Sequence, residues 1–261
     1  MQRALISGIA ISTICSMVGC FLVMRRYALF GDGIAHVAFG GVAVGLFMGI
    51  IPFWSAFVVS ILGSLGLQKM QNSKVSGEVA VAVTLVSGLS VGVILTSIAG
   101  GFTLDLFSFL FGSIILVSTN DMITILSISG VVALVIILLY RRLLFITFNA
   151  ELARVSGIRV TLLNYLFAVL AAITVVVAMR LTGILLITAL IVLPTLSASK
   201  FNRGFKGTMI ISAAISSSSV ISGIFISYLL DWAPSGTIVA LLVLSMVGVY
   251  TSYMIMGRLF R

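Results

Sequence analysis

The sequence predicts an all-α, polytopic membrane protein with a single transmembrane domain over residues 1–261. Hydrophobic residues make up 61% of the chain and charged residues only 8%, whereas soluble domains carry about 25% charged residues. The apolar segments are about 16 to 24 residues long, which suits spanning helices, whereas the strands of a membrane barrel need only about 10. A helical bundle in lipid is therefore the expected fold.

Nine apolar runs account for most of the chain and are the expected spans. They cover 5–24, 34–51, 53–68, 79–99, 122–140, 160–179, 183–199, 208–230 and 236–256. A further apolar stretch at 102–117 follows two glycines closely and carries Asp105 near its start. We expect that stretch to be re-entrant or interfacial, and the bundle to have eight or nine transmembrane helices.

The basic residues fall mainly on one side of this topology. With the N-terminus outside, thirteen of the fifteen lysines and arginines lie on the inner side, and only Arg3 and Arg180 lie on the outer side. Cytoplasmic loops are enriched in Lys and Arg, so we expect the N-terminus outside and the C-terminus in the cytoplasm. Because these residues are scattered over short loops, the net charge of +9 indicates topology and not a nucleic-acid partner.

The longest inner segment, 141–159, is too polar to span a membrane. Leu152 and Val155 recur at helical spacing beside Glu151 and Arg154, and Gly157 follows as a plausible C-cap. The pattern predicts a short amphipathic helix on the cytoplasmic face. Periodicity alone leaves its role open between an interfacial anchor and a docking surface for a partner.

The stretch FGDGIAHVAFGG, residues 30–41, contains the only histidine of the chain. Asp32 and His36 are four residues apart, so their side chains share one helix face. A carboxylate and an imidazole are both good ligands for zinc, manganese or ferrous iron, and ionisable groups in a span usually line a pathway or pair with each other. The alternative is that Asp32 only accepts a hydrogen bond from His36.

One aspartate and one histidine are too few for a stable zinc site, which needs three or four protein ligands. Two copies of the pair facing each other across a two-fold axis would supply four. Gly41, Gly45 and Gly49 follow on the same helix at four-residue spacing, a pattern that permits close approach of another helix. This stripe is typical of packing within one chain as well as between chains.

Two further residues are candidates for the pathway or a gate, each with a structural alternative. Glu78 opens the fourth expected span, where an acid also stabilises a helix N-terminus. Pro194 lies inside GILLITALIVLPTLSASK, where it removes a backbone hydrogen bond and is expected to kink the helix and free a carbonyl.

Catalytic motifs are missing from the sequence. It contains no G-x-x-x-x-G-K-[ST] phosphate loop, no G-x-S-x-G, no H-E-x-x-H and no second histidine for an acid–base relay. We therefore do not expect an enzyme, and any energy source must be a partner subunit or an ion gradient.

Five motifs in order resemble the membrane permease subunit of ABC importers for zinc, manganese or iron. The early motif is Arg25-Arg26 followed by GDGIAHVAFGG, and the later four are DLFSFLFGSIILVSTNDM, ELARVSGI, RLTGILLITALIVLPTLSASK and DWAPSGTIV. The similarity covers nearly the whole chain. It implies a type II ABC importer-like permease in the plasma or inner membrane that works by alternating access.

The resemblance also implies partners and residue roles. The partners are a second permease copy (identical or a close paralogue), two separate ABC ATPase subunits and an extracytoplasmic metal-binding protein. No cofactor is held permanently, because the divalent metal ion is the cargo. The helix at about 149–158 becomes a coupling helix that uses Glu151, Leu152, Arg154 and Gly157 to contact the ATPase.

Asp32 and His36 then contact the transported ion, although the expected sidedness places Asp32 near the cytoplasmic end of its helix unless residues 27–31 dip inward. Three other functions stay open. They are an ABC permease for a chelate such as a siderophore or cobalamin, a gradient-driven carrier or channel, and a membrane scaffold without transport activity.

Overall fold

Helices make up the whole regular structure of the computed structural model, which describes residues 2–73, 75–99, 109–112 and 118–259. Within these ranges eight helices are long and apolar enough to cross a membrane, and there is no strand. The long helices are α1 (Gln2–Met24), α2 (Phe30–Met48), α3 (Pro52–Asn72), α4 (Gly77–Ile98), α6 (Thr119–Phe148), α8 (Val160–Thr182), α10 (Gly204–Leu230) and α11 (Pro234–Leu259). The predicted all-α class is confirmed. Most of the stretch 102–117, including Asp105, lies outside the described residues.

The expected span at 183–199 is not one full-length helix. α8 ends at Gly183, whose φ is +72° and whose missing side chain leaves room for the backbone at Leu110 and Gly112. A short 3-10 turn (η1, Ile184–Leu186) then leads into α9 (Ile187–Ser199), which has 13 residues. Such a helix is about 20 Å long, against about 30 Å for the hydrocarbon core of a bilayer. α9 is therefore too short to span, and its first residue, Ile187, is fully buried.

Local sequence determines where several long helices begin. Pro52 occupies the first turn of α3, where its missing N–H is not needed. The Ser76 hydroxyl caps α4 by accepting from Val79 N at 3.4 Å. At the start of α6, Ser118 and Asp121 form a reciprocal capping box.

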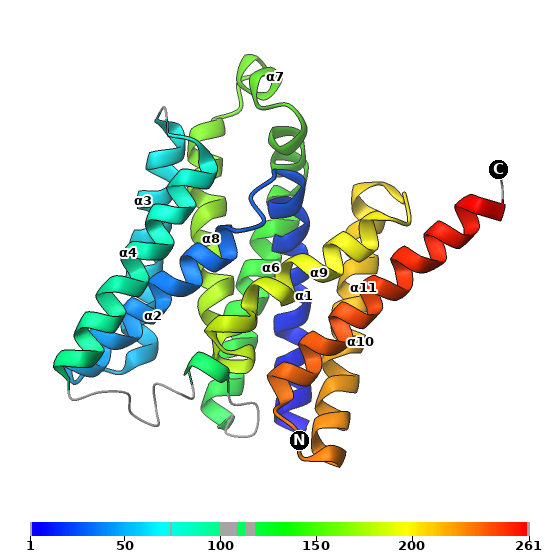
Figure 1. Cartoon of the computed structure of the whole chain (residues 1–261). Helices are drawn as coiled ribbons and strands as arrows, with labels where there is room; N and C mark the ends of the chain where they lie inside the picture. Colours follow the sequence, from blue (N-terminus) through cyan, green and yellow to red (C-terminus); the bar gives the residue numbers. More distant parts are fainter. Residues whose placement is uncertain (1, 74, 100–108, 113–117, 260–261) are drawn as a thin grey trace.

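The helices are arranged in three neighbouring groups (Figure 1). α2 packs against both α3 and α4, α1 packs against α6, α8, α9 and α10, and α11 packs against α9 and α10. A Cβ on Gly41 would lie 2.7 Å from the Ala56 Cα, and one on Gly45 would overlap Ser55. Gly41 and Gly45 therefore serve packing within this chain, against α3, whereas Gly49 is the left-handed C-cap of α2 and a Cβ there would meet no atom within 4 Å.

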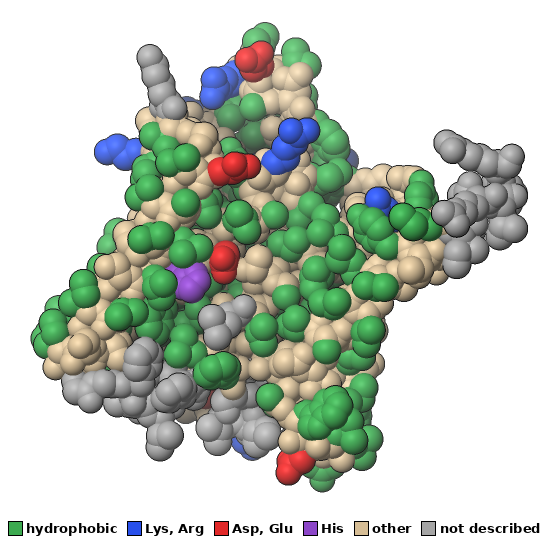
Figure 2. Space-filling model, in the orientation of Figure 1, with side chains coloured by type: hydrophobic (Ala, Val, Ile, Leu, Met, Phe, Trp, Pro, Cys, Tyr) green, Lys and Arg blue, Asp and Glu red, His purple; other side chains and the backbone are tan. Residues whose placement is uncertain are grey.

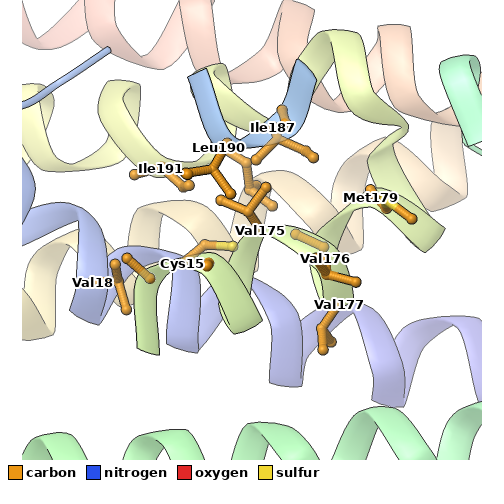
Figure 3. Close-up of a cluster of buried hydrophobic side chains, with 14 of the residues drawn as sticks. Cys15, Val18, Val175, Val176, Val177, Met179, Ile187, Leu190 and Ile191 are labelled. Atoms are coloured by element: carbon orange, nitrogen blue, oxygen red, sulfur yellow. The ribbon is translucent and has the colours of Figure 1, made fainter. Parts of the chain in front are cut away.

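The centre of the protein is formed by α1, α8 and α9. Figure 3 shows Val175 to Val177 and Met179 of α8 beside Cys15 and Val18 of α1 and Ile187, Leu190 and Ile191 of α9, all fully buried. About 70% of the apolar stretch in α1, α2 and α8 is buried, against 17% in α11. α11 therefore presents most of its surface to the surroundings of the chain.

The two ends of the bundle differ in charge. The N-terminus lies at the opposite end from the short helix α7 (Ala150–Val155) in Figure 1. In Figure 2 most of the visible Lys and Arg side chains lie toward the end that carries α7. This separation is the one that the loop charges predict, and it distinguishes the two ends of the molecule.

Candidate metal pathway

The first functional feature is the placement of the start of α2. After α1, the chain turns back through Arg26, whose φ is +61°, and Tyr27 N donates to Leu22 O at 2.8 Å. Figure 1 shows this connection descending from the end of α1 before α2 begins. A Cβ on Gly88, in the middle of α4, would lie 2.7–2.8 Å from the backbone of His36 and Val37. His36 is therefore level with the middle of α4, far from either end of the bundle.

Asp32 and His36 face each other without a direct hydrogen bond. His36 Nε2 lies 3.9 Å from Asp32 Oδ1, which is too long for a hydrogen bond. Two ligand atoms that each lie about 2.1 Å from the same metal ion can be up to about 4.2 Å apart. The separation of 3.9 Å between these two atoms is below that limit, so both can bind one divalent ion.

The pair also remains accessible from outside the chain. The His36 side chain is 18% exposed and the Asp32 side chain 32% exposed. Figure 2 shows the histidine at the surface of this face, among hydrophobic side chains and next to an acid. An ion or a second protein chain can therefore reach the pair without displacing the core.

Thr188 is a third polar side chain at the candidate site, and no sequence motif pointed to it. It lies at the start of α9, and its hydroxyl donates to Asp32 Oδ1 at 3.3 Å. Its position follows from the helix break at Gly183, which starts α9 level with the pair. The available signal was a single hydroxyl in the apolar run ILLITALIVL, residues 184–193.

One chain provides an incomplete set of metal ligands. Over the part of the chain that the structure describes, no group of three or more His, Cys, Asp or Glu side chains could hold a metal ion. The two cysteines, Cys15 and Cys20, are free and buried in α1. Asp32 and His36, with the Thr188 oxygen beside them, form a partial site that suits an ion in transit better than a resident one.

Glu78 and Pro194 lie away from this pair. Glu78 is exposed in the first turn of α4, ten residues before Gly88 and therefore about 15 Å along the helix from the level of His36. Pro194 is buried in α9, six residues after Thr188, and α9 continues through it. The structure thus places neither residue in contact with Asp32 or His36, and their gate role stays a prediction.

The segment 141–159 contains a short helix, α7, with an exposed apolar side. Asn149 Oδ1 accepts from Leu152 N at 2.9 Å and caps its start, and Gly157, with φ +78°, ends the turn after it. Ala153 is fully buried beside α6 and α8, whereas Leu152 is 56% exposed.

Three more residues of α7 point outward. Val155 is 86% exposed, and Glu151 and Arg154 are exposed. An outward surface with two apolar and two charged side chains on a rigid helix suits contact with another protein.

A second charged pair lies near the opposite end of the bundle. Arg180, at the end of α8, forms a salt bridge with Asp121, at the start of α6. The Arg180 guanidinium lies 4.3 Å from the centre of the Phe53 ring on α3. Asp121 also accepts from Ser118 Oγ at 2.8 Å. This pair joins three helices through direct contacts.

Fold and motifs together define the class of this protein, which is a multi-pass membrane permease of the ABC importer type. Residues 1–253 match the profile of the ABC 3 transport family. The chain therefore belongs to the ABC 3 transport family, and the resemblance carried by its five motifs is confirmed.

Named relatives agree with this assignment. The manganese import system permease protein ScaB of Streptococcus parasanguinis is 37% identical over 92% of this chain and 85% of its own length. The high-affinity zinc uptake system membrane protein ZnuB of Haemophilus influenzae is 30% identical over 90% of this chain and 91% of its own. A solved structure, PsaBC from Streptococcus pneumoniae in complex with Fab, superposes with a TM-score of 0.85, at 30% identity over 95% of this chain and 90% of that one.

Proposed function

We propose that this chain is the permease subunit of an ATP-driven importer of a divalent metal ion, manganese or zinc, with ferrous iron fitting the same ligands. The observation that carries the proposal is the open Asp32–His36 pair, 3.9 Å apart within the bundle and accessible on one face. Carboxylate and imidazole ligands suit all three ions, and selectivity among them depends on geometry and supply more than on affinity. The names of the manganese and zinc relatives support the same cargo class.

Three kinds of partner complete the proposed transporter. A second permease copy, identical or paralogous, adds its own pair to the partial site across the path. Two separate ABC ATPase subunits dock on α7 through Glu151, Leu152 and Arg154, with Gly157 setting the end of the helix. An extracytoplasmic binding protein delivers the ion at the end of the bundle opposite α7.

The proposed mechanism is alternating access, with the N-terminus outside the plasma or inner membrane and the C-terminus in the cytoplasm. ATP binding and hydrolysis in the partners move α7 and tilt the helices. Asp32 and His36 act as transient ligands, and their small number favours release of the ion. Glu78 and Pro194 lie on the pathway or at a gate. The permease itself catalyses no chemical reaction and holds no permanent cofactor.

The test is metal uptake by proteoliposomes that contain the permease, its ATPase and its binding protein. Asp32→Asn and His36→Gln should each abolish uptake of radiolabelled manganese or zinc while the complex still assembles. Asp231→Asn is the matched control, because Asp231 is an exposed acid at the left-handed end of α10, where asparagine is well tolerated. Normal uptake by both pair variants would refute the assignment of the site.

A further inference from the structure

Arg25 is a half-buried cation at the end of α1 whose side chain contacts two other helices. Its Nε donates to Thr147 Oγ1 at 2.9 Å, and its Nη1 donates to Asn164 Oδ1 at 3.1 Å. Nη2 reaches Leu143 O at 3.5 Å, and the guanidinium carbon lies 4.7 Å from the centre of the Phe167 ring. The side chain thus connects the end of α1 to both α6 and α8.

The contacts of Arg25 flank the segment that carries α7. Thr147 is the penultimate residue of α6, three positions before α7 begins, and Asn164 is the fifth residue of α8. α7 also rests on the same two helices through Ala153, which packs with Ile146 and Val160. We call α6, α7 and α8 at this end the coupling hairpin, and Arg25 contacts it on both of its arms.

No carboxylate neutralises Arg25 in the part of the chain that the structure describes, where the two ion pairs involve other residues. Desolvation lowers the pKa of Arg25 to about 10, so the guanidinium stays protonated at neutral pH. Burying a charge with only neutral partners is costly. An apolar side chain could hold the same helices together without that cost, so packing alone does not explain an arginine here.

Along the chain, a short hydrogen-bonded connection joins Arg25 to the Asp32–His36 pair. Asp32 follows seven residues later. Arg25 N and Arg26 N donate to Phe21 O and Val23 O of α1 at 3.1 and 3.0 Å, and Phe30 N donates to Tyr27 O at 3.0 Å. Because successive hydrogen bonds hold this connection, we expect a displacement of Arg25 to shift the start of α2.

We propose that Arg25 is a positioning residue that transmits movement of the coupling hairpin to the Asp32–His36 pair. The inference rests on the proposed function, since it presumes that an ATPase docks on α7 and that the pair binds the ion. Through its neutral hydrogen-bond partners and the aromatic ring, the guanidinium contacts both α6 and α8. Arg25 itself is attached to the end of α1.

The experiment compares Arg25→Gln with Arg26→Gln in the reconstituted complex of permease, ATPase and binding protein. Arg26 has the same charge, is the next residue and is exposed, so it is the matched control. ATP hydrolysis is measured without metal and with metal-loaded binding protein. Arg25→Gln should lower the stimulation by metal about ten-fold, within the usual range of coupling between sites. Its basal hydrolysis and complex assembly should stay at the wild-type level.

Two further variants separate positioning from simple structural support. Thr147→Val and Asn164→Leu keep Arg25 but remove its two short hydrogen bonds, and together they should lower stimulation in the same direction even if Arg25→Gln does not assemble. Arg25→Lys, which keeps the charge but not the planar fork, should restore only part of the stimulation.

The outcomes distinguish this inference from the proposed function. Wild-type complex that metal-loaded binding protein does not stimulate would refute the proposed function. If metal stimulates ATP hydrolysis equally in the wild type and in Arg25→Gln, only the role of Arg25 is refuted. If Arg25→Gln does not assemble, equal stimulation of the Thr147→Val/Asn164→Leu double variant refutes that role instead.

Discussion

Two acidic side chains inside the bundle each face a basic partner, and the two pairs are built differently. Near the end opposite α7, Asp121 forms a salt bridge with Arg180, which also covers the Phe53 ring. In the middle of the bundle, Asp32 and His36 stay 3.9 Å apart. Exposure does not explain the difference, because the side chains of both pairs are between 18% and 32% exposed.

The difference lies in how many partners each carboxylate has. Asp121 accepts from Arg180 through one oxygen and from the Ser118 hydroxyl through the other. In the part of the chain that the structure describes, the Asp32 carboxylate accepts one hydrogen bond, from the Thr188 hydroxyl at 3.3 Å. A carboxylate whose two oxygens both accept hydrogen bonds holds helices together. A carboxylate with free lone pairs is available to a metal ion. The first pair is therefore structural, and the second is the candidate for transport.

The largest expected difference between the pairs is their response to metal. At a metal concentration of 100 times Kd, binding stabilises the folded state by about 2.7 kcal/mol, a rise in Tm of roughly 5–10 °C for a chain of this size. Detergent-purified wild type and Asp121→Asn should show this rise with manganese or zinc, and Asp32→Asn should not. A metal-induced rise in Asp32→Asn equal to that of wild type would contradict the comparison.

The next largest effect is on stability without metal. Arg180→Gln leaves Asp121 without its cation and exposes Phe53, and should cost about 1–2 kcal/mol, since the pair is only partly buried. Tm should fall by roughly 2–8 °C, measured by thermal unfolding in detergent. His36→Gln removes no direct hydrogen bond to Asp32, so it should leave the metal-free Tm within about 1 °C of wild type. Equal losses in both variants would show that the middle pair also stabilises the fold.

A smaller effect is expected from the residue that orients Asp32. Thr188→Val removes one hydrogen bond worth about 1 kcal/mol, so the metal Kd of the permease should rise roughly five-fold. Thr188→Ser keeps the hydroxyl and should restore the affinity. Titration calorimetry on both variants checks this. An unchanged Kd in Thr188→Val would mean that Asp32 needs no support from α9.

The smallest effect concerns the helix cap beside the structural pair. Ser118→Ala removes the hydroxyl of the α6 capping box and one of the three hydrogen bonds that the Asp121 carboxylate accepts, at a cost of about 0.5 kcal/mol for an exposed cap. The salt bridge to Arg180 should persist, so Tm should fall by only about 1–2 °C and metal binding should not change. A larger loss would show that Ser118 is needed to hold Asp121 against Arg180.

The local features of the chain were predictable from sequence. Long apolar runs have no stable alternative to helices in lipid, so most of the long spans could be placed within about four residues. The exception is α6, which continues to Phe148, eight residues beyond the expected end at 140 and into the segment predicted to be too polar to span. The i, i+4 spacing of Asp32 and His36 needed only helical periodicity. Gly157 could be assigned to the end of α7 because a left-handed residue there favours glycine.

The contacts between distant segments were not predictable. Arg25 with Asn164, Arg180 with Asp121 and Thr188 with Asp32 join residues 59 to 156 positions apart, and no periodicity relates such positions. The break at Gly183 was also missed, because the run 183–199 is apolar throughout and only the backbone of residues 110–112 against Gly183 requires a residue without a side chain.

Sequence alone therefore determined that this protein lies in lipid, where its helices run and which residue types form the candidate metal pair, because hydrophobicity, spacing and ligand chemistry are local properties. Tertiary structure alone decided that Asp121 is paired with an arginine while Asp32 is not. It also decided which basic residue, Arg25, contacts both α6 and α8. Those outcomes depend on how α1, α6, α8 and α9 pack around one another, which places side chains from distant parts of the chain within a few ångströms.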